Sequence, residues 1–168
     1  MKKITGFNNN DHNQLKKGEK YGYVFTIVRD PVERFLSAFW HHMTLDSPKH
    51  YWRTTDAERS RIRHLFSDPN EFITAIENPD NSKHNVALEE FSYHTHFVAQ
   101  TSFLIDDKGN IDPRINDIFV YSKNLSKQLG IPISSINKTP RHPDIQLTEK
   151  SLAFIKRIYQ KDYELLGL

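Results

Sequence analysis

Residues 23–39 read YVFTIVRDPVERFLSAF, and this segment decides the predicted fold. Its first six residues form a near-continuous apolar run that is rich in β-branched and aromatic side chains, typical of a strand buried on both faces. Arg29 ends this run. Asp30, Pro31 and Glu33 then have the residue types of a helix N-cap, a first helical position and a capping-box partner. The segment therefore predicts a strand that turns directly into a helix, which is half of a parallel α/β unit.

The predicted helix runs from Pro31 to Thr44, and a polar stripe interrupts its apolar face. Arg34, Ser37 and His41 form this stripe, at the spacing i, i+3 and i+7. The apolar residues at core spacing are Val32, Phe35, Leu36, Phe39, Trp40 and Met43.

The polar residues around this strand and helix suit a phosphate. Arg29 leaves the carboxyl end of the strand, which is where open α/β sheets bind their ligands. An arginine offers a charge-assisted fork, and the hydroxyl of Ser37 offers a neutral donor. The residues alone leave a structural alternative open, in which Arg34 pairs with Glu33 or Asp30 and Ser37 packs as a small side chain.

Patterns further along the chain predict the remaining elements. An extended or β segment is expected at 97–105, a turn at 107–110 and a short buried strand at 118–121. A polar loop is expected to continue through Asn85. Helices are predicted at 56–66 and 70–77, both on the surface, at 124–129 with a stop at Gly130, and at 148–165 with Thr148 as N-cap. We expect one α/β domain over residues 1–168, without a linker.

Composition excludes several classes of protein. The chain has 168 residues and no cysteine, so neither a disulfide framework nor a thiolate metal site is expected. Its 23 basic and 21 acidic residues are too balanced to indicate a nucleic-acid surface. The N-terminal residues include lysines but no apolar run, and no later stretch is long enough to span a membrane. We therefore expect a soluble chain, cytoplasmic or of unassigned compartment, without nucleic acid as partner.

The string RDPVERFLSAF, residues 29–39, resembles the 3′-phosphate-binding motif of sulfotransferases that modify carbohydrates. These include the heparan 2-O and chondroitin classes and their bacterial relatives, which use 3′-phosphoadenosine-5′-phosphosulfate (PAPS) as co-substrate. The resemblance implies that Arg29 and Ser37 bind the 3′-phosphate of PAPS, or of its product adenosine 3′,5′-bisphosphate (PAP). Pro31 and Arg34 also match the motif.

Other segments resemble the same family, in the expected order. They are residues 96–100 (HFVAQ), 119–125 (FVYSKNL), 136–139 (INKT) and 158–165 (IYQKDYEL). The resemblance covers about residues 22–168, and it implies a P-loop-NTPase-like three-layer sandwich with a central parallel sheet. The implied reaction moves a sulfuryl group from PAPS to a hydroxyl acceptor, commonly on a glycan.

Two parts of the family pattern are not found. A first strand and a glycine- or serine-rich turn should cradle the 5′-phosphosulfate upstream of Tyr23, but residues 1–21 contain no such pattern. We therefore expect an N-terminally incomplete member with little or no transfer activity. Phe7 stands where some relatives carry a histidine that could act as base. His12 and His96 are the candidate bases here, although a solvated histidine is the alternative reading of His12.

Several alternatives remain open. His94 and His96 would share a face if their segment is extended, but no recognised ligand spacing accompanies them or the pair at 41–42, so no metal site is predicted. The basic cluster of Arg59, Arg61, Arg63 and His64 is either a surface for an anionic sugar chain or a solvated helix face. At the level of function, the rivals are a degenerate nucleotide- or glycan-binding module and an interaction protein that self-associates through a sheet edge.

Overall fold

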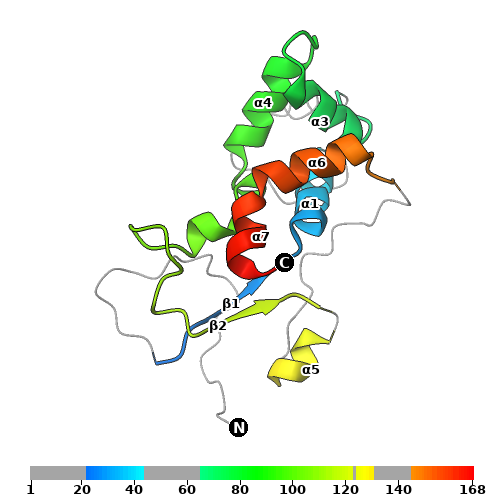
Figure 1. Cartoon of the computed structure of the whole chain (residues 1–168). Coiled ribbons are helices and arrows are strands. Elements are labelled where there is room, and N and C mark those ends of the chain that lie inside the picture. Colours follow the sequence, from blue (N-terminus) through cyan, green and yellow to red (C-terminus); the bar gives the residue numbers. More distant parts are fainter. Residues whose placement is uncertain (1–21, 44–64, 123, 131–144) are drawn as a thin grey trace. The chain divides into compact units, whose positions relative to one another are not determined.

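The computed structural model describes residues 22–43, 65–122, 124–130 and 145–168. They form two compact units, which we call the strand unit (described residues 22–29, 100–122 and 124–130) and the helical unit (described residues 30–43, 65–99 and 145–168). The strand unit contains β1 (Phe25–Val28), the 3-10 helix η2 (Gln100–Phe103), β2 (Asp117–Val120) and α5 (Leu125–Leu129) (Figure 1). The helical unit contains α1 (Pro31–Met43), α3 (Pro69–Glu77), α4 (His84–Tyr93), the 3-10 helix η1 (Thr95–Phe97), α6 (Glu149–Ile158) and α7 (Gln160–Leu166).

The strand unit contains a small parallel sheet, which confirms the predicted α/β class. β1 pairs with β2 in a register that runs from Phe25 opposite Asp117 to Val28 opposite Val120. The backbone N–H of Tyr121 donates to the Val28 carbonyl at 2.7 Å, just beyond the end of β2. The predicted burial of both strands is wrong for the described residues: Val28 alone is buried in β1, and Val120 in β2 is 45% exposed.

Two backbone turns of the strand unit form where the sequence predicts them. Gly109 has a φ of 80° and donates its N–H to the Asp106 carbonyl, which closes the turn between Ile105 and Ile111. α5 ends at Gly130, whose φ of 66° lies in the left-handed region that glycine adopts without steric cost. Both features follow from short-range backbone chemistry.

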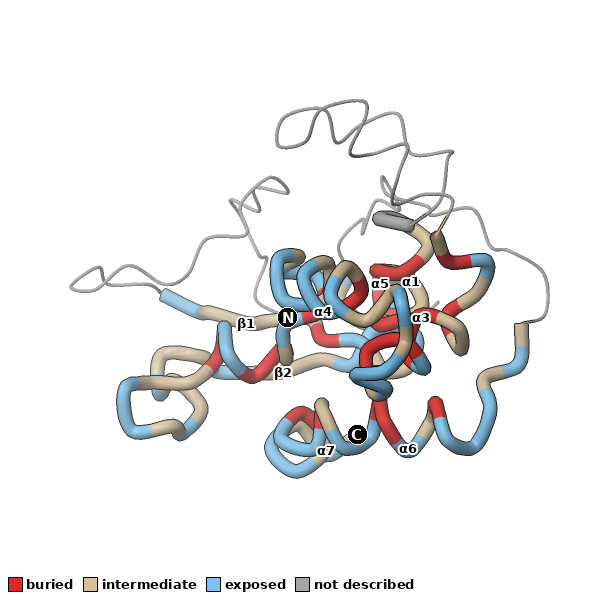
Figure 2. Tube along the Cα trace, turned by 90° about the horizontal axis from the view of Figure 1, so that it is seen from above, coloured by how far each residue is buried: buried red, intermediate tan, exposed pale blue. Residues whose placement is uncertain are grey.

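The helical unit contains an aromatic hydrophobic core. Phe72 of α3 is fully buried. The centroid of its ring lies 5.0 Å from the ring centroid of Phe66, 5.6 Å from that of Phe39, 5.7 Å from that of Phe97 and 6.4 Å from that of Phe35. α1 packs against α6 and η1, while α3 packs against α4 and α6. Figure 2 shows buried stretches, in red, along these helices. The buried residues of this core are Phe35, Ala38, Phe39, Phe66, Phe72, Ile73, Ala75, Ile76, Ala87, Phe97, Phe154, Ile155 and Tyr159.

The prediction of a surface helix at 70–77 is therefore wrong about its location. The helix exists, and it begins at Pro69 after an N-cap at Asp68, whose carboxylate accepts from the N–H groups of Asn70 and Glu71. Its apolar residues are buried, and the Phe72 ring packs against Phe39 of α1 and Phe97 of η1. The polar loop predicted through Asn85 ends sooner, because α4 begins at His84 and buries Ala87.

The caps predicted for the first and last helices are present. The Asp30 carboxylate accepts from the N–H of Val32 at 2.9 Å and of Glu33 at 3.0 Å, so it caps α1. The Thr148 hydroxyl accepts from the N–H of Ser151 at 3.1 Å and caps α6. Side-chain oxygens at these two positions satisfy N–H groups that have no partner within the helix.

The segment expected to be extended, 97–105, is instead mostly 3-10 helix and turn. η1 closes with hydrogen bonds from Phe97 N–H to the His94 carbonyl and from Val98 N–H to the Thr95 carbonyl. η2 follows at Gln100. A short apolar run does not distinguish a strand from such turns, because the choice depends on whether a neighbouring strand is available to pair with it.

The helix predicted at 148–165 is divided at Tyr159. This residue ends α6 with φ −107° and ψ 21°, and α7 starts at the next residue. The Tyr159 side chain is 1% exposed, and its hydroxyl donates to the Phe97 carbonyl at 2.7 Å. Burial, the largest effect, and the negative charge of Asp162 raise the pKa of the Tyr159 hydroxyl, while the positive charge of Arg34 acts in the opposite direction.

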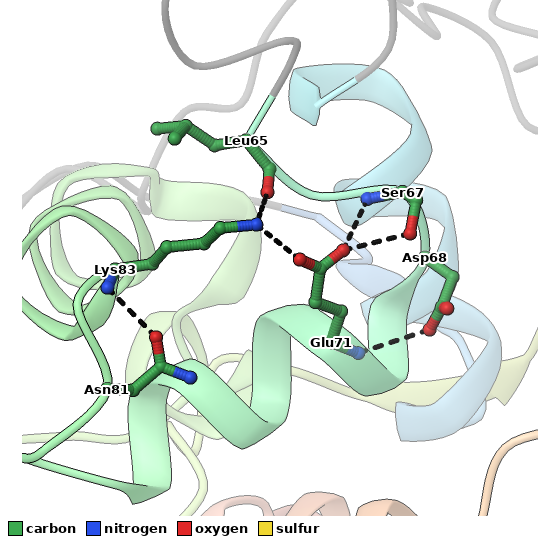
Figure 3. Close-up of polar contacts among 6 residues, drawn as sticks. All are labelled: Leu65, Ser67, Asp68, Glu71, Asn81 and Lys83. Carbon is green, nitrogen blue, oxygen red and sulfur yellow. Dashed lines mark hydrogen bonds and ion pairs between the residues drawn. The ribbon is translucent and has the colours of Figure 1, made fainter.

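A polar network joins the residues before α3 to α3 and to the start of α4 (Figure 3). The Lys83 ammonium donates to the Glu71 carboxylate and to the Leu65 carbonyl. The second Glu71 oxygen accepts from the N–H of Ser67 at 2.7 Å and from its hydroxyl at 2.9 Å. Burial acts to raise the pKa of the Glu71 carboxyl, but the hydrogen bonds from Lys83 and Ser67 outweigh it and hold this pKa below its ordinary value.

Candidate functional site

Arg29, the first predicted phosphate ligand, lies directly after β1 in the strand unit. Arg29 is exposed, while its backbone is held by the side chain of Gln100. The Arg29 N–H donates to Gln100 Oε1, and Gln100 Nε2 donates to the Arg29 carbonyl, both at 2.8 Å. One side-chain amide thus satisfies both backbone groups of Arg29.

The guanidinium of Arg29 lies over an aromatic ring. Its central carbon is 5.1 Å from the ring centroid of Tyr121, the residue that follows β2. This distance is within the range of a cation–π interaction. The carboxyl ends of two parallel strands therefore present an exposed guanidinium supported by an exposed tyrosine, a pair that suits an anionic ligand.

Ser37, the second predicted ligand, is a half-buried residue of α1 in the helical unit. Arg29 belongs to the strand unit, so the two residues lie in different units. On the chain they are eight residues apart, separated by the Asp30 cap and the first turns of α1.

Arg34, which also matches the sequence motif, connects α1 to η1. Its guanidinium donates to the Val98 carbonyl and, at 3.4 Å, to the Thr95 carbonyl. The sequence did not predict these carbonyl partners. The Asp30 carboxylate, one of the two partners considered from sequence, accepts from backbone N–H groups. Within the helical unit, Arg34 therefore holds the irregular chain of η1 against α1.

His94 and His96 do not share a strand face, because their segment is not extended, which was the condition for that arrangement in the sequence. His96 is exposed on η1, and His94 precedes it as the residue that ends α4. A ring nitrogen of His94, Nε2, lies 2.8 Å from a carboxylate oxygen of Glu90, four residues earlier. The difference follows from the 3-10 conformation, because only an extended chain places residues i and i+2 on one side.

Two residues that contact Arg29 were missed as site residues by the sequence analysis. Gln100 ends the HFVAQ segment and Tyr121 lies in the FVYSKNL segment, so both fall inside stretches that resemble the family. The signal was therefore present in the sequence. The sequence could not show, however, that these residues contact Arg29. Gln100, for example, is 71 positions away from it along the chain.

Several predicted features lie outside the described residues. They are the atypical N-terminal segment with Phe7 and His12, the basic cluster at 59–64 and the segment 136–139. In the described part of the chain, no group of three or more potential ligand residues could hold a metal ion. Among the same residues, no helix has both the length and the apolar character needed to cross a membrane.

These observations define a mixed α/β protein with a pair of parallel strands. After β1, the chain passes through Arg29 into the capped helix α1. Arg29 is thus a cationic residue at the strand end where such proteins bind ligands. A family model described as "Sulfotransferase family" matches residues 2–168, and the chain belongs to the sulfotransferase family. The match includes residues 2–21, which the motif-level resemblance did not cover. Neither a curated protein nor a solved structure matches the chain.

Membership of this family carries a general chemistry. Its members transfer a sulfuryl group, generally from PAPS, to a hydroxyl acceptor. The small parallel sheet and the helices of the described residues are consistent with the P-loop-like fold of sulfotransferases.

Proposed function

We propose that this protein binds PAPS or PAP, that the reaction it serves is sulfuryl transfer to a hydroxyl group of a carbohydrate, and that the chain by itself turns over slowly or not at all, as its sequence predicts. Arg29 and Ser37 are the proposed ligands of the nucleotide 3′-phosphate. The observation that carries the proposal is the exposed Arg29 guanidinium at the carboxyl end of β1, within the segment that resembles the family's 3′-phosphate motif. The family match over residues 2–168 supports the reaction class.

The chemistry proposed for each residue follows from its type. The Arg29 guanidinium would give the 3′-phosphate a charge-assisted pair of hydrogen bonds, and the Ser37 hydroxyl would add a neutral donor. In the transfer step, the acceptor oxygen forms a bond to sulfur as the bond from sulfur to the 5′-phosphate oxygen breaks, and PAP leaves. The acceptor proton passes to a base, for which His12 and His96 are the candidates from sequence.

Arg29 and Ser37 are proposed to act mainly through binding. The 3′-phosphate is remote from the sulfur, so contacts to it are equally strong in the ground state and the transition state. Interactions of that kind lower KM and leave kcat largely unchanged. Loss of either contact should therefore appear first as weaker nucleotide affinity.

Calorimetry with PAP tests the proposed ligands. Arg29→Ala should weaken PAP binding by about 1.5–3 kcal/mol, the usual range for a hydrogen bond from a charged donor. Ser37→Ala should weaken it by about 0.5–1.5 kcal/mol, the usual range for a neutral donor. Lys108→Ala, which removes an exposed cation from the turn of the strand unit, is the matched control and should bind PAP as the parent does. Unchanged PAP affinity in Arg29→Ala would refute the assignment.

A transfer assay tests the reaction. Radiolabelled PAPS would be incubated with the chain and a panel of glycans and small alcohols, and labelled product measured. Product that depends on a glycan supports the carbohydrate acceptor. PAP binding without labelled product from any acceptor would instead favour the nucleotide-binding module that the sequence left open.

A further inference from the structure

We infer that Gln100 and Tyr121 are positioning residues for Arg29: Gln100 holds its backbone, and Tyr121 supports its guanidinium. The inference rests on the proposed function, because it takes Arg29 as the residue that binds the 3′-phosphate. All three residues belong to the strand unit, so the contacts among them lie within one unit.

The side chain of Gln100 holds the backbone of Arg29. The register between β1 and β2 ends at Val28, so Arg29 lies beyond the paired part of the sheet. At such a position the chain would ordinarily be free to change direction. The Gln100 amide instead makes two hydrogen bonds of 2.8 Å with Arg29, as a neighbouring strand would: its Oε1 accepts from the Arg29 N–H, and its Nε2 donates to the Arg29 carbonyl. These bonds restrict both the φ and the ψ angle next to the Arg29 side chain.

Gln100 is itself held by burial and by the turn that follows it. Gln100 is only 9% exposed, so if its amide lost these hydrogen bonds, water could replace them only poorly. Thr101, the next residue, is 1% exposed, and its carbonyl accepts from the N–H groups of Leu104 and Ile105. Gln100 therefore stands at the start of a short, internally bonded turn. Such a turn gives the amide a fixed position from which to bond Arg29.

Tyr121 supports the guanidinium of Arg29. The N–H of Tyr121 donates to the Val28 carbonyl at 2.7 Å, which fixes the tyrosine beside the residue that precedes Arg29. Its ring then lies 5.1 Å from the guanidinium carbon. Such a contact limits where the guanidinium can lie, and its N–H groups are the donors that form paired hydrogen bonds with a phosphate.

Together these contacts arrange Arg29 before a ligand arrives. An arginine loses much side-chain freedom when it binds an anion, and a side chain held in advance loses less. Removal of either support should therefore weaken recognition of the 3′-phosphate specifically, while the rest of the nucleotide is bound as before.

The test compares two nucleotides, PAP and adenosine 5′-monophosphate, which lacks the 3′-phosphate. Gln100→Met keeps the length of the side chain and removes both hydrogen bonds. It should weaken PAP binding about 3- to 10-fold and change binding of the monophosphate less than about 2-fold, since one or two neutral hydrogen bonds are at stake. Tyr121→Leu should weaken PAP binding about 2- to 5-fold, as expected for an exposed cation–π contact, while Tyr121→Phe should retain the parent affinity.

The same variants made together with Arg29→Ala distinguish the two proposals. If Gln100 and Tyr121 act through Arg29, their substitution has no further effect on PAP binding once that arginine is gone. An equal loss of PAP and monophosphate affinity, or a full additional loss in the Arg29→Ala background, would overturn the positioning role. If the Arg29→Ala variant alone binds PAP as tightly as the parent, the proposed role of Arg29 in binding the 3′-phosphate is wrong, and the positioning role that depends on it falls too. Should Gln100→Met fail to fold, the exposed Tyr121 pair of variants still decides the outcome.

Discussion

The two arginines of the RDPVER segment, Arg29 and Arg34, are five residues apart on the chain and belong to different units of the molecule. In the helical unit, Arg34 donates to the carbonyls of Thr95 and Val98, so its hydrogen bonds serve the packing of η1 against α1. In the strand unit, Arg29 is exposed and is contacted by the side chains of Gln100 and Tyr121. One arginine thus contributes to the fold, while the other is held at the surface.

The same contrast holds for the two units as a whole. The aromatic core lies in the helical unit, around Phe72. The strand unit buries Val28, Leu104 and Leu125, and leaves Tyr23 and Phe103 about half exposed, at 52% and 45%. Stability should therefore depend mainly on the helical unit, and ligand affinity mainly on the strand unit. The predictions below test this division.

The largest effect is expected at the centre of the aromatic core. Phe72→Ala should lower the free energy of unfolding by about 3–5 kcal/mol, because it removes a fully buried ring and leaves a cavity. Chemical denaturation would measure the loss. Leu88→Ala on α4, where the parent side chain is 42% exposed, is the control and should change stability by less than about 0.5 kcal/mol. Similar losses for both substitutions would contradict the location of the core.

A smaller loss is expected where α6 and α7 meet. Tyr159→Phe removes the hydroxyl that donates to the Phe97 carbonyl and leaves this carbonyl without that donor, which should cost about 1–3 kcal/mol. Thermal unfolding of both proteins near pH 7 would measure the difference.

The same tyrosine should make stability depend on alkaline pH. Burial raises the pKa of Tyr159 above the ordinary tyrosine value of about 10, so above that pH the unfolded chain loses its proton while the folded chain keeps it. The contribution of Tyr159 is therefore fully present below pH 10 and declines as the pH rises further. The parent should lose stability above pH 10 more steeply than Tyr159→Phe, and parallel curves would argue against a buried hydroxyl.

The two arginines offer the most direct test of the division between units. Arg34→Ala should lower the free energy of unfolding by about 1–2 kcal/mol through loss of its hydrogen bonds to backbone carbonyls. Arg29→Ala should change stability by less than about 0.5 kcal/mol, as is usual for an exposed side chain. Denaturation of both variants under one set of conditions would settle the comparison, and the reverse order would assign the structural role to Arg29.

The smallest effect is expected in the network around Glu71. The pKa of the Glu71 carboxyl lies below its ordinary value. The contribution of this carboxylate to folding stability is therefore present near neutral pH and is lost as the pH falls through the folded-state pKa. Lys83→Met should lower stability by about 0.5 kcal/mol near pH 7, because the ion pair is one-third exposed and screened by water. This difference should shrink when the measurement is repeated in acid. A difference that stays constant down to pH 3 would assign the effect to packing of the lysine chain.

Local chemistry made several elements predictable. The step from β1 to α1, the caps at Asp30 and Thr148, and the end of α5 at Gly130 depend on residues within a few positions of one another. Arg29 was predicted to leave a strand at its carboxyl end, and that location is confirmed. Its proposed role as a phosphate ligand remains a prediction, as does that of Ser37.

Features that depend on distant residues were the ones missed. The sequence predicted an extended segment at 97–105, a surface helix at 70–77 and an unbroken C-terminal helix. In each case local periodicity indicated an apolar face or an apolar run, but could not identify what would cover it. The helix at 84–93 was missed because its beginning, at His84, has no side-chain cap and its apolar stripe is narrow, with Ala87 as its one buried residue.

The sequence by itself therefore determined the family, the start of the first helix, the turns at glycine and the two strands, because those signals are carried by consecutive residues. Only the tertiary structure decided the partners of the key side chains. Arg29 bonds Gln100 across 71 positions, Arg34 bonds Val98 across 64, and Tyr159 bonds Phe97 across 62. A propensity is a property of a residue and its neighbours, whereas a hydrogen bond between distant groups exists only once the packed chain brings both ends together.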